Sequence, residues 1–210
     1  DVRDCPVWRD QQTGAEYYRL PAGNYSVSGE LTKGIMVAPS DPNYSASGEQ
    51  ITLRVKGEVV YNYQGAAPES TYMIDFYNNN DCPITIVGSR NATVKLQSGA
   101  GFIYNDGFGD GSGGTAIKPR TTIKNITFDG NNVPADNLIF FDDSAGCARN
   151  LTIENCTFMN FKANTSNDKE YSPYHSPVQV ESGAASAKSG TGSPIPATVN
   201  ITGCTFKNNE

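Results

Sequence analysis

A short pattern of apolar and polar positions occurs three times in the second half of the chain, at residues 121–128, 149–158 and 198–206. Each copy places two apolar residues three positions apart and ends on Thr-Phe. The aligned apolar positions are Ile123, Ile126 and Phe128, then Ile153, Cys156 and Phe158, and finally Ile201, Cys204 and Phe206. Thr, Ile, Val, Cys and Phe favour a pleated surface over a helix. Each copy is therefore predicted to form two short strands joined by a bend.

The bend is predicted at Asn125, Asn155 and Gly203, which stand directly before the second apolar residue of each copy. Asn and Gly tolerate positive φ, so the chain can turn a corner between the two strands without forming a hairpin. We further expect Asn125 and Asn155 to form a structural ladder, in which each side chain bonds to the neighbouring backbone at the bend.

A unit of this size cannot bury its own apolar side, and it becomes stable when successive copies stack on one another. Copies that run in the same direction pair as parallel strands. A third strand per repeat is predicted at residues 102–104, 138–141 and 178–180. The sequence therefore predicts an all-β solenoid of parallel strands, with three sides and three turns per coil.

The repeated motif, written Thr-Ile-x-Asn-Cys-Thr-Phe-x-Asn, resembles the coils of right-handed parallel β-helix proteins of the pectate-lyase-like superfamily. The resemblance covers residues 84–128 and 138–206 well and residues 1–83 only loosely. It implies a right-handed, three-sided parallel β-helix. Lyases, hydrolases, phage tailspikes and adhesins all use this fold, so the resemblance says less about function. Bacterial and archaeal adhesin-like surface proteins carry many Asn- and Thr-rich coils of this style.

The length of 210 residues favours one domain, residues 1–210. Residues 1–18 are predicted to cap the solenoid, with Trp8 over the exposed core, and residues 19–83 to form the first irregular coils. Residues 84–210 are predicted to form regular coils. Solenoids need capped ends, and no polar cap is recognisable after the last repeat. We therefore expect a C-terminally truncated solenoid, the N-terminal part of a longer protein.

The net charge is −6, with 16 basic and 22 acidic residues and no basic run, which argues against nucleic acid and anionic membranes as partners. No apolar stretch is long enough to span a membrane. The chain begins at Asp1 without a signal peptide. We interpret it as the processed form of an exported protein, extracellular and attached to the cell surface. The oligomeric state stays open, because solenoid ends and edges can pair.

Long turns connect the predicted strands at residues 105–120, 159–177 and 182–197. The first and last are rich in Gly and Ser, and the middle one is rich in aromatic residues. Sugar rings stack on aromatic faces, and acidic groups bind sugar hydroxyls. The candidate ligand-binding residues are Phe108, Phe161, Tyr171, Tyr174 and Asp106. An equally good explanation is that these aromatic residues cover the solenoid wall.

Acidic residues follow directly after the predicted third strands. They are Asp106 in one coil, Asp142 and Asp143 in the next, and Glu181 in the third. Stacking would place them on one edge, about 5 Å apart per coil and about 10 Å over two coils. Asp106, Asp142 and Asp143 could then bind Ca²⁺ through oxygen ligands. Asp142, Asp143 and Glu181 could instead supply the two carboxyl groups of a glycosidase.

The competing interpretation of this acidic edge is structural, because Asp and Asn are ordinary turn residues at strand ends. The chain lacks the Gly-Asp-Asp and Gly-His-Gly motifs of the family's hydrolases and the Arg motif of its lyases. His175 is the only histidine, which excludes a His-rich metal site. Cys156 and Cys204 occupy equivalent inward positions, and we expect them to form a buried stack of thiols that pack as small hydrophobic groups.

The function expected from the sequence is that of a non-catalytic, adhesin-like module that binds a glycan or a host surface protein through its long turns. The alternative is a polysaccharide lyase or glycoside hydrolase that acts at the acidic edge. A purely structural stalk is a third hypothesis, and the long turns argue against it. The expected chemistry needs no cofactor, except Ca²⁺ if the acidic edge binds metal.

Overall fold

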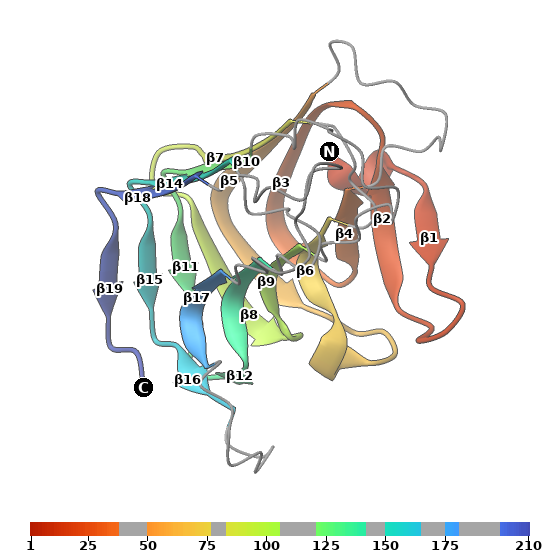
Figure 1. Cartoon of the computed structure of the whole chain (residues 1–210). Coiled ribbons are helices and arrows are strands. Elements are labelled where there is room, and N and C mark those ends of the chain that lie inside the picture. The colour runs from red at the N-terminus through yellow and green to blue at the C-terminus, as the bar shows by residue number, and fades with distance from the viewer. Residues whose placement is uncertain (38–49, 77–82, 106–120, 142–149, 165–174, 181–197) are drawn as a thin grey trace, which may run out of the picture.

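The computed structural model describes residues 1–37, 50–76, 83–105, 121–141, 150–164, 175–180 and 198–210. These residues form strands and two short 3-10 helices, η1 (Val2–Asp4) and η2 (Pro68–Ser70), and contain no α-helix. No helix in this part of the chain is long and apolar enough to cross a membrane. The strands run side by side in curled sheets, from β1 at one end of the molecule to β19 at the other (Figure 1). The protein is all-β with mainly parallel strands.

The first sheet, sheet A, contains one strand from each successive pass of the chain. In order across the sheet they are β1 (Val7–Arg9), β2 (Glu16–Leu20), β4 (Gly34–Val37), β6 (Tyr72–Asp75), β9 (Gly101–Asn105), β13 (Asn137–Phe141) and β17 (Ser176–Val180). All neighbours are parallel except β1, which is antiparallel to β2. The third strands predicted at 102–104, 138–141 and 178–180 are therefore confirmed as β9, β13 and β17.

The second sheet, sheet B, consists of two rows of parallel strands. The first row contains β7 (Ile84–Gly88), β10 (Thr121–Lys124), β14 (Asn150–Glu154) and β18 (Thr198–Thr202). The second contains β8 (Thr93–Ser98), β11 (Thr127–Asp129), β15 (Thr157–Met159) and β19 (Thr205–Lys207). Two long strands, β3 (Gly23–Leu31) and β5 (Ile51–Asn62), join the rows, because β5 pairs with both β7 and β8. A small third sheet contains β12 (Pro134–Ala135) and β16 (Lys162–Ala163).

The corner between the two rows of sheet B is formed by one residue with positive φ in each pass. These residues are Gly29 (φ 67°), Gly57 (63°), Asn91 (61°), Asn125 (61°), Asn155 (52°) and Gly203 (63°). Residues other than Gly and Asn rarely adopt this conformation, which explains why only these two types occur at the corner. The bends predicted at Asn125, Asn155 and Gly203 are confirmed.

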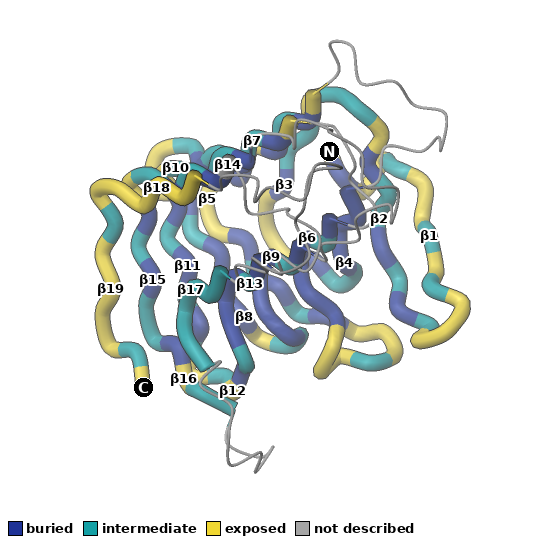
Figure 2. The backbone as a smooth tube through the Cα atoms, viewed as in Figure 1, coloured by how far each residue is buried: buried dark blue, intermediate teal, exposed yellow. Residues whose placement is uncertain are grey.

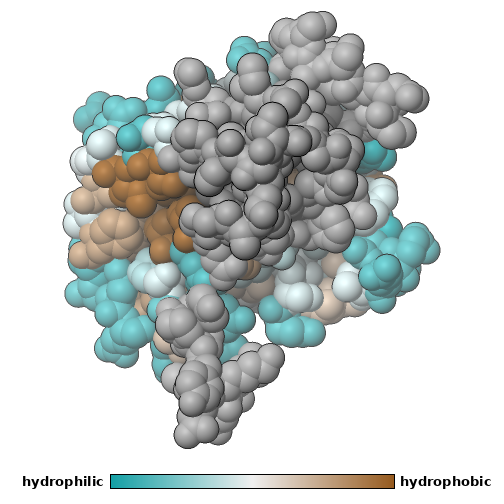
Figure 3. All heavy atoms as spheres, in the orientation of Figure 1, coloured by the Kyte–Doolittle hydropathy of each residue, from teal (hydrophilic) through white to brown (hydrophobic). Residues whose placement is uncertain are grey.

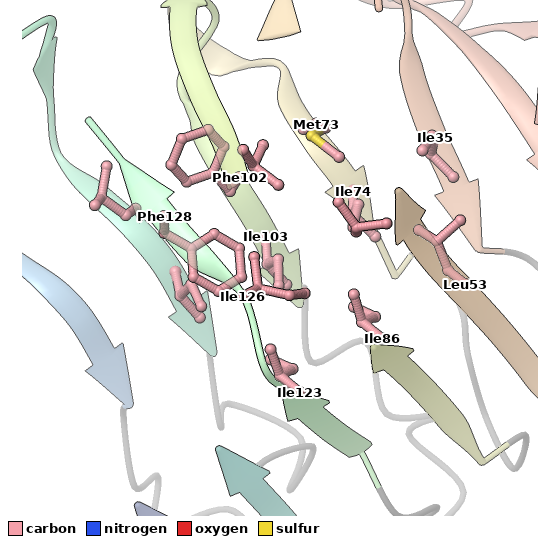
Figure 4. Close-up of a cluster of buried hydrophobic side chains, with 14 of the residues drawn as sticks. Ile35, Leu53, Met73, Ile74, Ile86, Phe102, Ile103, Ile123, Ile126 and Phe128 are labelled. Atoms are coloured by element: carbon pink, nitrogen blue, oxygen red, sulfur yellow. The ribbon is translucent and has the colours of Figure 1, made fainter. Parts of the chain in front are cut away.

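The core lies between the sheets and is built from like residues stacked in register. In sheet A, Ile35 pairs with Ile74, Ile74 with Ile103 and Ile103 with Ile139. Figure 4 shows the first three of these side chains in a row, with Phe102 and Phe128 beside them. Burying each such side chain stabilises the fold by about 1.5–3 kcal/mol. The interior is therefore a continuous apolar column along the stacked strands.

The N-terminal end of this column is covered by the first residues of the chain. Val2 in η1 is fully buried in the main core. The Arg3 guanidinium donates hydrogen bonds to the backbone oxygens of Ser28 and Glu30, which lie on β3. The prediction that Trp8 covers the core is wrong. The antiparallel pairing of β1 with β2 holds Trp8 on the outer face of sheet A, where it packs against Tyr17 with ring centroids 6.0 Å apart.

The opposite end of the column is open among the described residues. Strands β17, β18 and β19 form the last positions of their rows, and every residue of β18 and β19 is exposed. Figure 2 shows this change from a buried interior to an exposed last layer.

Candidate functional site

Most of the ligand-binding and catalytic residues predicted from the sequence lie outside the described residues. They are Asp106, Phe108, Asp142, Asp143, Tyr171, Tyr174 and Glu181. The acidic edge and its Ca²⁺ site therefore stay predictions. Among the described residues, no group of three or more His, Cys, Asp or Glu side chains has the arrangement of a metal site.

The candidate ligand-binding residue Phe161 lies inside the core, so its ring is not available on the surface for stacking against a sugar. Its side chain is 2% exposed and belongs to the main core. The chain turns at Asn160, which has a φ of 53°, and Phe161 then points inward while the backbone continues into β16. The backbone N–H of Phe161 donates to Asn209 Oδ1 at 3.0 Å, which fixes this corner against the next layer.

The predicted thiol stack matches the positions of Cys156 and Cys204. Cys156 is buried, and its Sγ lies 3.8 Å from the Ile123 oxygen in the preceding layer. Cys204 repeats this contact with the Ile153 oxygen at 3.7 Å, and both thiols are free. Burial raises the pKa of the Cys156 thiol to about 11.

Alkylation tests the difference in exposure between the two thiols, because Cys156 is buried and Cys204 is half-exposed. Because only the thiolate reacts, we expect iodoacetamide at about pH 8 to modify the half-exposed Cys204 well before Cys156. Peptide mass spectrometry over time measures both rates in one sample. Equal rates would contradict the burial of Cys156. The rate at Cys156 should rise with pH up to about 11.

The Asn ladder differs in detail from the expectation. Asn125 and Asn155 lie at the bends as expected and are exposed, and Asn155 Nδ2 contacts Glu154 Oε1 at 3.5 Å. A side-chain bond from Asn to the backbone occurs at the following corner, where Asn209 Nδ2 donates to the Phe158 oxygen at 3.1 Å. Positive φ therefore accounts for Asn125 and Asn155, and cross-layer bonding accounts for Asn209.

The outer face of sheet A carries a hollow of about 750 Å³ that sequence reasoning missed. Its walls come from the β1–β2 connection, η2 and the outward side chains of β2, β6, β9 and β13. Its lining includes aromatic, acidic and amide side chains: Trp8, Asp10, Tyr17, Glu69, Tyr72, Asp75, Tyr104, Asp136, Asn137 and Phe140. We call this hollow the sheet A groove.

A row of aromatic rings crosses the sheet A groove. The Tyr72 and Tyr104 rings are stacked with centroids 5.2 Å apart, and the centroids of the Tyr104 and Phe140 rings are 5.5 Å apart. Tyr104 and Phe140 are register partners on adjacent strands. Side chains alternate between the faces of a strand, so Ile103 and Ile139 enter the core while Tyr104 and Phe140 face outward.

Two glycines make room for the tyrosine rings of the groove. A Cβ at Gly34 would meet the Tyr17 ring, and one at Gly101 would lie 2.6 Å from Tyr72 Cε1. Each ring therefore lies along the sheet, over a neighbouring strand that has no side chain at that position. Burial raises the pKa of Tyr17 and Tyr72 well above the usual range, so both phenols stay protonated near neutral pH.

Carboxylate and amide groups surround the aromatic row. Asp75 is the register partner of Tyr104, and Asn137 donates through Nδ2 to Gln179 Oε1 at 2.6 Å. Asp136 Oδ1 lies 3.7 Å from His175 Nδ1, an ion pair when the imidazole is protonated. At one rim, the backbone N–H of Thr13 donates to Asp10 at 3.0 Å and lowers the pKa of that carboxyl.

The sequence carried one signal for this groove. Each of two later strands of sheet A places an aromatic residue directly after its inward isoleucine, as Ile103-Tyr104 and Ile139-Phe140. Such a pair exposes a ring on the outer face at the same height in neighbouring layers. Tyr72 and Tyr17 carry no such local signal, because only the strand pairing places Tyr72 beside Tyr104 and Tyr17 in the same groove.

Comparisons with protein-family models, curated proteins and solved structures find no match to this chain.

Proposed function

We propose that the stacked parallel strands form a right-handed, three-sided parallel β-helix. Three rows of strands in register, one corner residue of positive φ per pass and a continuous apolar column support this architecture. Right-handedness is the nearly universal rule for connections between parallel strands of one sheet. We also propose that the chain is related to the pectate-lyase-like superfamily, because its repeated motif resembles the coils of those proteins.

We propose that this β-helix is a non-catalytic, adhesin-like extracellular module that binds a glycan in the sheet A groove. The observation that carries the proposal is the row of Tyr72, Tyr104 and Phe140 on three neighbouring strands, with carboxylate and amide groups beside it. The C–H faces of sugar rings pack on aromatic rings, while polar groups fix the hydroxyls. The proposed binding site is thus the face of a sheet, whereas the sequence analysis expected binding through the long turns.

The shape and charge of the groove narrow the class of glycan. Aromatic side chains extend from Trp8 and Tyr17 on β1 and β2 to Phe140 on β13, so the site is elongated across several strands. An elongated site suits a chain of sugars better than one small molecule. The acidic lining and the net charge of −6 disfavour polyanionic glycans. We therefore propose a neutral polysaccharide, or an acidic one only where Ca²⁺ bridges it.

The experiment that tests this proposal is a binding panel of neutral and acidic polysaccharides, followed by calorimetry on the strongest ligand. Replacing Tyr104 by Ala removes the central ring of the row, and we expect affinity to fall about tenfold or more. Phe206→Ala is the matched control, because Phe206 is 49% exposed at the far end of the stack and should leave affinity unchanged. Unchanged binding by Tyr104→Ala, with native circular dichroism, would contradict the proposal.

A second function, glycan cleavage, is favoured by one observation. Asp75 and Asp136 both line the groove, and glycosidases use two carboxyl groups. New reducing ends, or the ultraviolet absorbance of unsaturated uronate, would show cleavage of a panel substrate. Product that disappears in Asp75→Asn would assign catalysis to this groove, whereas product that disappears only in Asp142→Asn would assign it to the acidic edge. Binding without product supports the non-catalytic module.

A further inference from the structure

The corner between the two rows of sheet B carries a second hollow, of about 340 Å³, which shares no lining residue with the sheet A groove. Figure 3 shows hydrophilic side chains along this edge of the molecule, at the upper left of the view, where the connections between the two rows are stacked in Figure 1. The polar residues that line the hollow are Ser89, Arg90, Asn91, Asn125, Thr127 and Asn155. We call it the corner hollow.

A longer connection between two strands forms one wall of the corner hollow. Two residues connect β10 to β11 and β14 to β15, whereas four residues, 89–92, connect β7 to β8. The Ala92 N–H donates to the Ser89 oxygen at 3.1 Å and closes a tight turn. Asn91 has a φ of 61° at the third position of this turn, as a type II turn requires. Arg90 therefore lies at the tip of the turn, and it is exposed.

The neighbouring layers hold this turn on both sides. The Ser89 N–H donates to the Val55 oxygen at 2.8 Å in the layer before it. In the layer after it, the Thr127 N–H donates to the Ala92 oxygen at 3.0 Å. The hollow is thus formed before a ligand arrives, so binding does not require the backbone to become ordered.

A row of asparagine side chains forms the floor of the corner hollow. Asn91, Asn125 and Asn155 are exposed at successive corners, about 5 Å apart. Each amide group offers two N–H donors and one acceptor oxygen. Asn155 Nδ2 lies 3.5 Å from Glu154 Oε1, so a carboxylate stands at the end of the row opposite Arg90. This row can bind the hydroxyl groups of a sugar ring.

The charge beside Arg90 is positive, although the whole chain carries 22 acidic and 16 basic residues. Arg54 and Lys124 lie at the same height on the outer face, because both are register partners of Val87. In the part of the chain that the structure describes, Arg54, Arg90 and Lys124 form no ion pair. The guanidinium of Arg90 is therefore available to an anion from outside the chain.

We propose that the corner hollow binds a single sugar residue that carries an oxyanion, which is a phosphate, sulfate or carboxylate group. The oxyanion accepts two parallel hydrogen bonds from the Arg90 guanidinium, and the sugar hydroxyls bind the amides of Asn125 and Asn155. Glu154 repels a second anionic group at the far end of the row, which favours one charged residue over a polyanion. This site is separate from the sheet A groove and from the neutral glycan proposed there.

A nuclear magnetic resonance titration of the intact, ¹⁵N-labelled chain tests this site. The probes are glucose 6-phosphate, glucuronate and glucose, which differ in the group on one carbon. We expect either or both anionic sugars to shift the side-chain amide signals of Asn91, Asn125 and Asn155, less so at high salt, and glucose to leave them in place. The two anionic probes distinguish a phosphate site from a carboxylate site. No shift with either anionic sugar, or equal shifts with glucose, would overturn the proposal.

Substitution of Arg90 tests the contact to the oxyanion. We expect Arg90→Gln to lower the affinity for the anionic sugar about tenfold or more, and Arg90→Lys to lower it less, because Lys keeps the charge but lacks the planar fork. The matched control is Arg9→Gln, which removes the same charge from an exposed position on β1. Unchanged affinity in Arg90→Gln, or an equal loss in Arg9→Gln, would overturn the proposal. Tyr104→Ala should leave this affinity unchanged, so the two proposed sites succeed or fail separately.

Discussion

Replacing Phe158 by Ala is expected to lower the free energy of unfolding by about 3–5 kcal/mol. Its side chain is fully buried and stacks between the rings of Phe128 and Phe206, with ring centroids 5.2 Å and 5.0 Å away, respectively. Neighbouring layers are held in register by strand pairing and cannot close in on the cavity, so most of the lost contact stays lost. Denaturant unfolding followed by circular dichroism measures the change.

The matched control is Thr157→Ala on the same strand. Thr157 is the sequence neighbour of Phe158, and its side chain faces outward and is only half-buried. We expect a loss below about 1 kcal/mol, as for other surface positions. Losses of similar size at both positions would contradict the alternation of inner and outer faces on which the account of the fold depends.

Gly88→Ala is expected to cost about 1–3 kcal/mol or more, because the added methyl group meets backbone that cannot move. A Cβ at Gly88 would collide with the backbone oxygen of Asn125 and lie 2.8 Å from the Ala92 Cβ. Asn125 is fixed in turn, since its N–H donates to the Glu154 oxygen at 3.1 Å. Thermal unfolding monitored by circular dichroism measures the loss as a lower midpoint.

A second glycine serves as the control for Gly88. Gly57 has a φ of 63°, and no atom lies within 4 Å of the place that a Cβ would occupy. A side chain at this position is therefore limited by the backbone conformation but meets no neighbouring atom. Asn occupies the equivalent corner positions 125 and 155 at similar φ. We therefore expect Gly57→Asn to change stability by about 0.5 kcal/mol or less. A large loss there, with none in Gly88→Ala, would contradict the explanation by close backbone approach.

The regular half of the fold was predictable from the sequence because its signals are local. Asn125, Asn155 and Gly203 each stand at a fixed place within a short motif. Because the copies of this motif run in the same direction, they are expected to pair as parallel strands. The N-terminal half lacks this signal. There β3 and β5 run through the corner as single strands, with Gly29 and Gly57 in place of Asn.

The sheet A groove was not predictable because distant segments assemble it. Trp8 and Phe140 reach the same hollow only through the pairing of successive strands, and a shift of one residue in any register would turn a ring inward. For Phe161, the sequence-based expectation placed on the surface a side chain that is buried in the structure. It was expected in the aromatic-rich long turn at residues 159–177, but the bend at Asn160 returns the chain toward the core.

Hydroxyl-radical footprinting with and without the strongest glycan distinguishes binding in the sheet A groove from binding at the long turns. Radicals oxidise aromatic side chains in proportion to their exposure, so peptide mass spectrometry compares the groove with the long turn in one experiment. We expect the glycan to protect Tyr104 and Phe140 and to leave Tyr171 and Tyr174 unchanged. Protection of Tyr171 and Tyr174, with unchanged oxidation of Tyr104 and Phe140, would contradict the sheet A groove as the binding site.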